Sequence, residues 1–340
     1  MQIKRENEVD EDTLIHEPVL LNEVIKYLKI NELAHLKSQA KVIDATFGYA
    51  GHGVEFLMRG IDVLGIETDR QMIEFAKKRL SKDLKSPEHF PATKVKTKNS
   101  QKLKDKISRL SRRIGKYLIS QGNFRDMKKI AVENNFTECD AILFDLGVSS
   151  YQLTSGNRGF SFNNPEAVLD MRTDTGSDQP LAKDFLNLMS KEELMKTFMI
   201  SCGYKFAKEL TQSVIKKRKI NSFVKVGDFL NLITTIHPPK NERLHPATLP
   251  FLALRIKVNN ELENLKDALS QVHDLLKIGG RLAVISFHSG EDRIVKEFIR
   301  GSVKRGLFMK ITTKPICPSE QEMIINRRSR SAKLRVIERI

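Results

Sequence analysis

Glycines and a carboxylate follow two strand-like runs, and together they suit a nucleotide-like ligand. The segment Gly48–Gly53 lies between a strand-like run and a helical stretch, so its backbone can approach a ligand beside a helix N-terminus. Glu67 ends the second run, where a carboxylate can accept hydrogen bonds from both hydroxyls of a ribose. Asp69 is the reserve candidate, and the alternative for Glu67 is an acid that only begins the next helix. The pattern predicts a site for an adenosine-bearing ligand.

A second carboxylate, Asp145, closes the apolar run Asp140–Asp145 and precedes the loop Leu146–Ser150. Open α/β sheets bind their ligands at the edge where such strands end. A carboxylate that leaves a hydrophobic strand at this edge is poorly placed for a structural role. We therefore expect Asp145 to lie beside the ligand, and the alternative is a cap on the following turn.

Histidines and cysteines indicate neither a metal site nor a covalent nucleophile. The eight histidines include no H-x-x-x-H pair, and Cys139, Cys202 and Cys317 show no C-x-x-C spacing. His288–Ser289 with Asp292 suggests a nucleophile, but the G-x-S-x-G turn that exposes a catalytic serine does not accompany it. We predict no catalytic metal, no zinc ribbon and no disulfide framework.

An α/β alternation supplies the elements that must hold these residues. Strand-like runs end at the glycine turn, at Glu67 and at Asp145, and helical stretches separate them. This alternation predicts a parallel, doubly wound α/β sheet of the Rossmann type. The predicted strands are 41–46, 61–66, 116–120, 140–145 and 281–287, with short terminal strands around 310 and at 333–338, and the predicted helices cover 70–80 and begin near 126 and 291.

The alternation stops after Gln152, and the pattern is mostly helical as far as Pro250. We predict an inserted helical domain at 153–250 between two parts of the sheet domain, 1–152 and 251–340. Beyond the insertion, apolar residues recur by three and four from Val258 to Leu276, which predicts a single helix that Gly279–Gly280 ends.

The charge balance points to a polyanionic partner. The chain has 58 Lys and Arg against 42 Asp and Glu, a net charge of +16. The alternative is a basic surface that only maintains solubility. No apolar run approaches the roughly 18 residues that span a bilayer, and residues 1–17 are mixed and acidic rather than signal-like. We expect a cytoplasmic protein without a membrane partner.

A basic amphipathic segment interrupts the first half of the chain. Residues 94–116 contain ten Lys or Arg and one acid. Leu103, Ile107, Leu110 and Ile114 are spaced as one stripe of a helix. The alternatives are a solvated helix packed on the core, an RNA contact, and a helix on a membrane surface.

Nine motifs of the chain resemble, in order, those of the bacterial 16S rRNA cytosine-N4 methyltransferase family, RsmH (formerly MraW). They are Ile43–His52, Asp145–Leu153, Arg158–Phe162, Leu169–Arg172, His245–Thr248, Ala253–Ile256, Gly279–Arg281, Ser286–Ser289 and Arg328–Arg335. The resemblance runs from about His16 to Arg339, and only a basic insertion at about 82–116 falls outside it.

The resemblance implies a class I methyltransferase domain with an inserted helical substrate-recognition domain. It also implies S-adenosyl-L-methionine as the cofactor, and methylation of the N4 exocyclic amine of a decoding-centre cytidine in the 16S rRNA of the small ribosomal subunit. Asp145, or a carbonyl of the loop Leu146–Ser150, is then the expected acceptor of an N4 hydrogen, and Phe124 offers an apolar face to the adenine. The cofactor contacts that the resemblance implies are Ala50, Gly51, His52, Glu67, Phe124, Asp145 and Gln152.

A second set of residues is expected to contact the RNA. Guanidinium and aromatic groups alternate between Arg158 and Arg172, a combination that can neutralise phosphates and stack bases, although Phe160 and Phe162 are alternatively core residues. The pair at 255 and 259 lies one helical turn apart and alternatively braces the insertion. The expected RNA contacts are Arg158, Phe160, Arg172, Arg255, Asn259 and His288, with further phosphate contacts from the segment 94–116 and from Arg327, Arg328, Arg330, Lys333 and Arg335.

Four departures from the family pattern leave alternatives open. Ala50 replaces a glycine, Glu67 replaces an aspartate, Gly290 replaces a leucine, and Gly203–Tyr204 lacks the usual acid. The alternatives are a methyltransferase of the same fold that acts on another nucleic acid, and a catalytically idle ribosome-assembly factor. A nicotinamide dehydrogenase is disfavoured because G-x-G-x-x-G is missing. The oligomeric state stays open, and a homodimer is one alternative.

Overall fold

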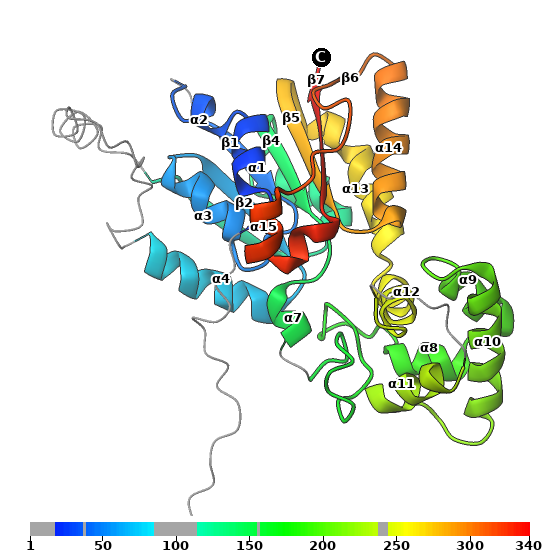
Figure 1. Ribbon diagram of the computed structural model, residues 1–340. Coiled ribbons are helices and arrows are strands. Elements are labelled where there is room, and N and C mark those ends of the chain that lie inside the picture. The colour runs from blue at the N-terminus through cyan, green and yellow to red at the C-terminus, as the bar shows by residue number, and fades with distance from the viewer. Residues whose placement is uncertain (1–17, 37–38, 85–113, 155–156, 237–243) are drawn as a thin grey trace, which may run out of the picture. The chain divides into compact units, whose positions relative to one another are not determined.

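The computed structural model describes residues 18–36, 39–84, 114–154, 157–236 and 244–340 (Figure 1). These residues form two compact units, one of Val148–Glu263 and one of Glu17–Gly147 with Asn264–Ile340. The helical unit is therefore longer at both ends than the predicted insertion 153–250. Most of the basic segment predicted at 94–116 lies outside the described residues. Among the described residues, no helix combines the length and the apolar character that a bilayer crossing needs.

One seven-stranded sheet lies at the centre of the larger unit, in the order β3-β2-β1-β4-β5-β7-β6 (Figure 1). Strands β1 to β5 run parallel, and β7 is antiparallel to both β5 and β6. The predicted Rossmann-type sheet is thereby confirmed. The strands are β1 (Lys41–Asp44), β2 (Asp62–Glu67), β3 (Tyr117–Gln121), β4 (Cys139–Asp145), β5 (Leu276–Ser286), β6 (Phe308–Lys310) and β7 (Lys333–Arg339).

Helices of this unit connect the strands or flank the sheet (Figure 1). They are α1 (Leu21–Tyr27), α2 (Ile30–Leu33), α3 (Gly51–Met58), α4 (Arg70–Asp83), η3 (Phe124–Asp126), α6 (Met127–Glu133), α14 (Ser289–Lys304), α15 (Glu320–Ile325) and η4 (Arg327–Ser331). Helix α13 (Glu261–Leu275) leads into β5. The helix predicted from Val258 to Leu276 is present as α13 but is shorter at both ends. The left-handed backbone of Asn260 (φ 49°) separates it from Val258, which ends the preceding helix, and Leu276 with Gly279–Gly280 lies in β5.

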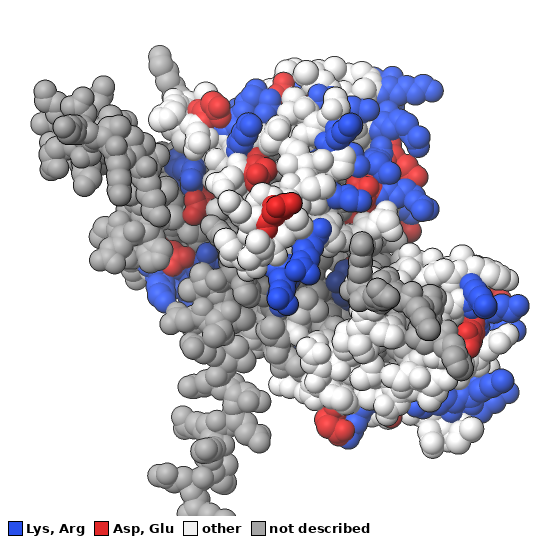
Figure 2. Space-filling model, viewed as in Figure 1, with Lys and Arg blue, Asp and Glu red and all other residues white. Residues whose placement is uncertain are grey.

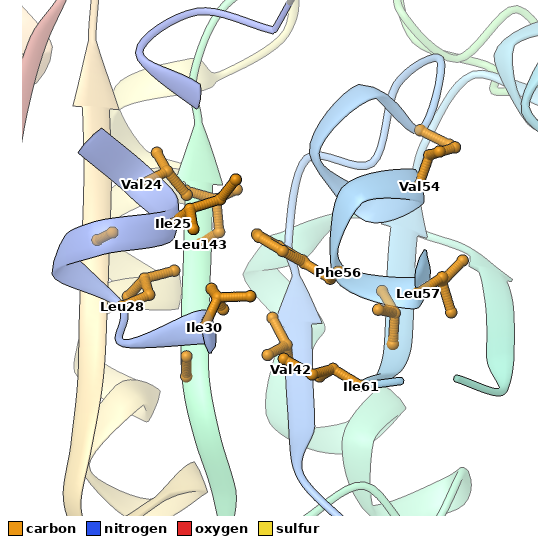
Figure 3. Packing of buried hydrophobic residues seen from close by; sticks show 14 of the residues in the cluster. Val24, Ile25, Leu28, Ile30, Val42, Val54, Phe56, Leu57, Ile61 and Leu143 are labelled. Carbon is orange, nitrogen blue, oxygen red and sulfur yellow. The ribbon is translucent and has the colours of Figure 1, made fainter. Parts of the chain in front are cut away.

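Two buried clusters occupy opposite faces of the sheet. Successive residues of a strand point to opposite faces, so Val42 and Leu143 join the cluster under α1 and α3, whereas Ile43 and Phe144 join the cluster under α6, α13 and α14. Figure 3 shows the first cluster, in which Phe56 of α3 is fully buried. Burial of one such side chain contributes about 1.5–3 kcal/mol, so these clusters fix the strand ends where the site forms.

The smaller unit is helical and has a core of its own, which includes Phe198, Phe229 and Leu254. Its helices are α7 (Ser150–Thr154), α8 (Ala182–Leu188), α9 (Lys191–Phe198), α10 (Tyr204–Arg218), α11 (Val226–Thr235) and α12 (Thr248–Val258). Helix α12 packs in this core through Leu254 and Val258. This packing explains why the unit extends beyond residue 250, the predicted end of the inserted domain.

Candidate functional site

A tight turn joins β1 to α3 at the carboxyl edge of the sheet. Gly48 and Ala50 both have left-handed backbones, with φ of 51° and 59°. The turn lies close to β2, because the Phe47 amide donates to the Ile66 carbonyl at 2.9 Å. A Cβ at position 65 would lie 2.4 Å from the Phe47 ring, so glycine is required at that place in β2. The turn therefore presents backbone rather than side chains beside the end of β2.

Glu67 lies at the end of β2 and holds this turn. Its Oε2 accepts from the Gly48 amide at 2.8 Å, and its Oε1 accepts from the Asp69 amide at 2.8 Å. Asp69 itself accepts from the Gln71 amide at 3.0 Å and caps α4. Glu67, and not Asp69, is thus the acid that faces the turn. Burial raises the pKa of Glu67 to about 7, against the lowering effect of backbone hydrogen bonds from Asp69, Gly48 and Thr68.

Asp145 is the most unusual acid of the site. Its side chain is 25% exposed, and its Oδ1 has no hydrogen-bond partner among the described residues. Its amide donates to Thr46 Oγ1 at 2.6 Å, which ties the end of β4 to the turn after β1. Burial, with the negative charges of Asp44 and Glu291, raises the pKa of Asp145 well above its ordinary value.

His52 faces Asp145 with its Nδ1, a nitrogen that carries no proton and cannot donate. Its Nε2 lies 3.1 Å from the Val19 carbonyl oxygen, which only accepts, so Nε2 carries the proton. Burial lowers the pKa of His52 to about 4, and the ring is neutral near pH 7. Its bare Nδ1 therefore lies 3.7 Å from Asp145 Oδ2. Lone pairs on His52 Nδ1 and Asp145 Oδ2 therefore face each other and repel. A proton on Asp145 or a cationic ligand removes this repulsion.

Phe124 lies near the same edge, at the start of η3. Its loop is joined to β2, because the Gly122 amide donates to the Glu67 carbonyl at 2.9 Å and Thr68 Oγ1 donates to the Gly122 carbonyl at 3.1 Å. Its ring packs edge-on against Phe144, with centroids 5.7 Å apart. Part of the ring stays accessible, so it can contact a planar apolar group.

Asp44 and Glu291 belong to this acidic group, although neither was predicted from the sequence as a site residue. Asp44 ends β1, and burial raises its pKa to about 7. Glu291 accepts from the Phe287 and His288 amides at 2.8 and 3.2 Å, at the N-terminus of α14. The detectable signal was their position, since one ends a strand and the other begins a helix next to a predicted strand end.

The residues of this unit fit a cationic nucleoside ligand such as S-adenosylmethionine. Four acids lie at or near the strand ends, one buried carboxylate oxygen has no partner within the described part of the chain, and a turn exposes its backbone. Six of the seven expected cofactor contacts, Ala50, Gly51, His52, Glu67, Phe124 and Asp145, lie in this unit. The seventh, Gln152, lies in the helical unit, where its Oε1 accepts from the Ser149 amide at 2.9 Å.

Several expected RNA contacts form bonds within the helical unit. Asn259 is buried, accepts from the Thr173 amide at 2.8 Å and donates to the Met171 carbonyl at 2.8 Å. Arg255 Nε and Nη2 both donate to Glu261, at 2.9 Å each. These bonds favour the alternative in which both residues brace the insertion.

The loop that precedes α8 is braced in a similar way. Arg172 pairs with Asp170 at 2.8 Å, and Arg158 lies over the Phe160 ring, 5.3 Å from its centroid. Phe160 is only 7% exposed, which favours the core alternative for this ring. Phe162 stacks on His245 with centroids 4.6 Å apart.

His288, the remaining expected RNA contact, caps α14 in the sheet unit. Its Nδ1 accepts from the Glu291 amide at 3.4 Å. Asp292 instead pairs with Arg335 at 2.8 Å. The structure therefore gives His288 and Asp292 separate structural partners rather than the shared contact that a nucleophile would need.

The strand order and the acid at the end of β2 together define a Rossmann-type nucleotide-binding protein. The chain belongs to the MraW methylase family, whose model matches residues 13–104 and 87–340. S-Adenosyl-L-methionine is accordingly its cofactor.

Similar proteins align along almost the whole chain. The Ribosomal RNA small subunit methyltransferase H of Dictyoglomus thermophilum is 38% identical over 335 residues, which cover 97% of this chain and 99% of that one. The relative of the same name from Thermotoga neapolitana is 36% identical, with 96% of each chain covered. The alignments include both units, so the similarity is not confined to the cofactor-binding fold.

Proposed function

We propose that this chain methylates the N4 exocyclic amine of a decoding-centre cytidine in the 16S rRNA of the small ribosomal subunit. The single observation that carries the proposal is the near-complete alignment with relatives named for small-subunit rRNA methylation. The net charge of +16 supports a polyanionic substrate. Such a substrate would place the enzyme in the cytoplasm.

The residues at the strand ends would hold the cofactor along its length. Glu67 would accept from the ribose hydroxyls, the turn around Ala50 and Gly51 would lie against the methionine end, and Phe124 would contact the adenine. When bound, S-adenosylmethionine supplies an electrophilic methyl group on a positively charged sulfur. The acids near Asp145 would stabilise that positive charge.

Asp145 would act on the incoming amine. The lone pair of the cytosine N4 is delocalised into the ring, so attack requires alignment and an acceptor for an N4 hydrogen. The Asp145 side chain is 25% exposed, so its carboxylate can offer an oxygen that accepts this hydrogen once the group is ionised. The target base would leave its stack to reach this oxygen. The loop Leu146–Ser150 contributes carbonyls as the alternative acceptors.

Binding of the donor is expected to strengthen as pH rises toward 7. Burial raises the pKa values of Asp44 and Glu67 to about 7, so below that pH a cationic ligand must displace protons from the empty site. For each proton released, the Kd falls about tenfold per pH unit below 7 and levels off above it. Calorimetric titrations from pH 5.5 to 8.5, in buffers of different ionisation enthalpy, measure the Kd and the number of protons released. A Kd independent of pH, without proton release, would contradict the assignment.

The same acids affect the stability of the unliganded protein with a definite sign. Because their folded pKa is raised, the folded state binds these protons more tightly than the unfolded chain does. Their contribution to stability is therefore complete below pH 4 and is lost as pH rises through 7. We expect the donor to raise the melting temperature more at pH 8 than at pH 6.

The basic segment at 94–116 is expected to add phosphate contacts. Binding to small ribosomal subunits should weaken steeply with salt, because each phosphate contact releases counterions. Deletion of residues 94–114 should reduce both the affinity and the salt dependence. Affinity that hardly changes between low and moderate salt, or that survives the deletion, would reject this role.

Analysis of rRNA nucleosides tests the proposed reaction itself. Mass spectrometry of small-subunit rRNA should detect N4-methylcytidine at a decoding-centre position in cells with the chain and not in cells without it. A methyl group on another RNA would show a related methyltransferase instead. Donor binding without any methylated product would indicate an assembly factor that retains the fold.

A further inference from the structure

The exposed face of α14 carries a row of basic side chains. Val295 and Ile299 bury the opposite face of the helix against the sheet. Arg293, Lys296, Arg300 and Lys304 are exposed, and we call these four residues the α14 basic stripe. At 100° per residue they fall within an arc of about 80° and extend about 16 Å along the axis. Figure 2 shows Lys and Arg gathered along this helix, on the right of the view.

Local structure does not account for the stripe. Among the described residues, its one ion pair within 4.0 Å joins Lys296 to Asp292 at 3.8 Å, and Asp292 is already hydrogen-bonded to Arg335 at 2.8 Å. The helix dipole favours a cation at Lys304 in the last turn. It does not favour Arg293, which lies in the N-terminal half. Glu297 is an exposed acid on the same face, so the four cations of the stripe outnumber the two acids beside them, Asp292 and Glu297, and a net positive charge remains.

The basic face is a local feature rather than the general character of this unit. Helix α13 lies on the same side of the sheet, and its exposed residues include Glu263, Asp267 and Asp274. The stripe instead continues toward the C-terminal arginines. Lys333 at the start of β7 lies 3.9 Å from the same Asp292 carboxylate that Lys296 approaches. Lys296 of α14 and Lys333 of β7 therefore lie on either side of one carboxylate.

We infer that the α14 basic stripe binds the phosphodiester backbone of the small-subunit RNA, an inference that rests on the proposed function. Its cations recur every three or four residues, or about 4.5–6 Å along the helix, and can contact successive phosphates of one strand. Flexible Lys and Arg side chains on a rigid helix bind phosphates without reading bases. The stripe thus orients the substrate, and the choice of cytidine is made at the methyl-transfer site.

The test replaces Arg293, Lys296 and Arg300 together by Gln in the full chain. With small subunits from cells that lack the enzyme, we expect the KM for subunits to rise about tenfold at moderate salt, and the slope of log affinity against log salt to decrease in magnitude by about 2–3. The kcat at saturating subunits, the Kd for S-adenosylmethionine and the melting temperature should stay at their wild-type values, because these side chains are exposed. Arg293→Lys with Arg300→Lys should retain the wild-type KM.

A matched control removes the same charge elsewhere, by replacing Lys128, Lys129 and Lys266 with Gln on α6 and α13. Acids surround that surface, and Lys128 pairs with Asp274 at 2.6 Å. We expect its KM and salt slope to stay within about twofold of wild type. A wild-type KM and salt slope in the α14 variant would overturn the inference. An equal rise in KM and an equal change of slope in the control variant would overturn it as well. If the wild-type enzyme itself methylates no subunit, the proposed function fails, whereas an active wild type with an unaffected α14 variant refutes the stripe alone.

Discussion

Replacement of Asp145 by Asn is expected to reduce kcat by about 10²–10⁴-fold while the protein stays folded. The side chain is placed by β4 and by the bond from its amide to Thr46, and neither depends on the carboxylate charge. Asn keeps the shape but cannot accept a proton. Because burial disfavours the charge at this position, the variant should melt no lower than wild type at pH 8.

Asp140 provides a control on the same strand. Its carboxylate is buried, pairs with Lys277 and accepts from the Lys41 amide at 2.8 Å. Asp140→Asn should therefore lower the stability, by about 1–3 kcal/mol, and leave kcat within about twofold of wild type. Single-turnover methylation and thermal melting of both variants measure this contrast. Near-normal turnover in Asp145→Asn would remove Asp145 from the mechanism and leave the loop carbonyls as acceptors.

Replacement of Glu67 by Gln is expected to weaken S-adenosylmethionine binding by about tenfold to hundredfold. Hydrogen bonds to a charged group contribute about 1.5–3 kcal/mol, and the carboxylate both holds the Gly48 turn and would accept from the ribose. Since neither contact lies at the reacting methyl, kcat at saturating donor should change little. Calorimetric titration of the donor and initial rates at several donor concentrations measure the two effects separately.

Two further variants serve as controls for Glu67→Gln. Glu67→Asp keeps the charge and should lose no more than a few-fold in donor affinity. Glu74→Gln on α4 removes an exposed carboxylate that pairs with Lys77 at 2.9 Å, and should leave donor binding unchanged. If Glu67→Gln bound the donor as wild type does, another residue would have to hold the ribose.

Most of the sheet was predictable because its signals are local. The strands that end at Glu67 and Asp145 are short apolar runs with polar ends, and the Gly48 turn follows such a run directly. The starts of α4 and α14 were within two residues of prediction, since capping side chains lie next to the helices they begin. The break near Asn260 was missed, because apolar spacing continues across it while the backbone turns.

The site was only partly predictable, because burial and partners are tertiary properties. The sequence predicted Arg172, Arg255 and Asn259 as RNA contacts, with a bracing alternative for the last two, and the structure shows each of them engaged inside the helical unit. Phe160 is likewise buried in the core rather than exposed to a substrate. In the sheet unit, Asp44 and Glu291 were not recognised, since nothing in their local sequence shows that both acids come close enough to raise the pKa of Asp145.

By itself the sequence determined the family, the class of sheet and the identities of the acids at its strand ends, because motif spacing and apolar periodicity depend only on the order of residues in the chain. Only the tertiary structure decided how those groups act on one another. The proton on His52 Nε2, the Asp145 oxygen that has no partner among the described residues, and the turn held by Glu67 all depend on segments far apart in the chain. Hydrogen bonding and desolvation depend on distance in space, and that distance is set when the strands pair and the helices cover them.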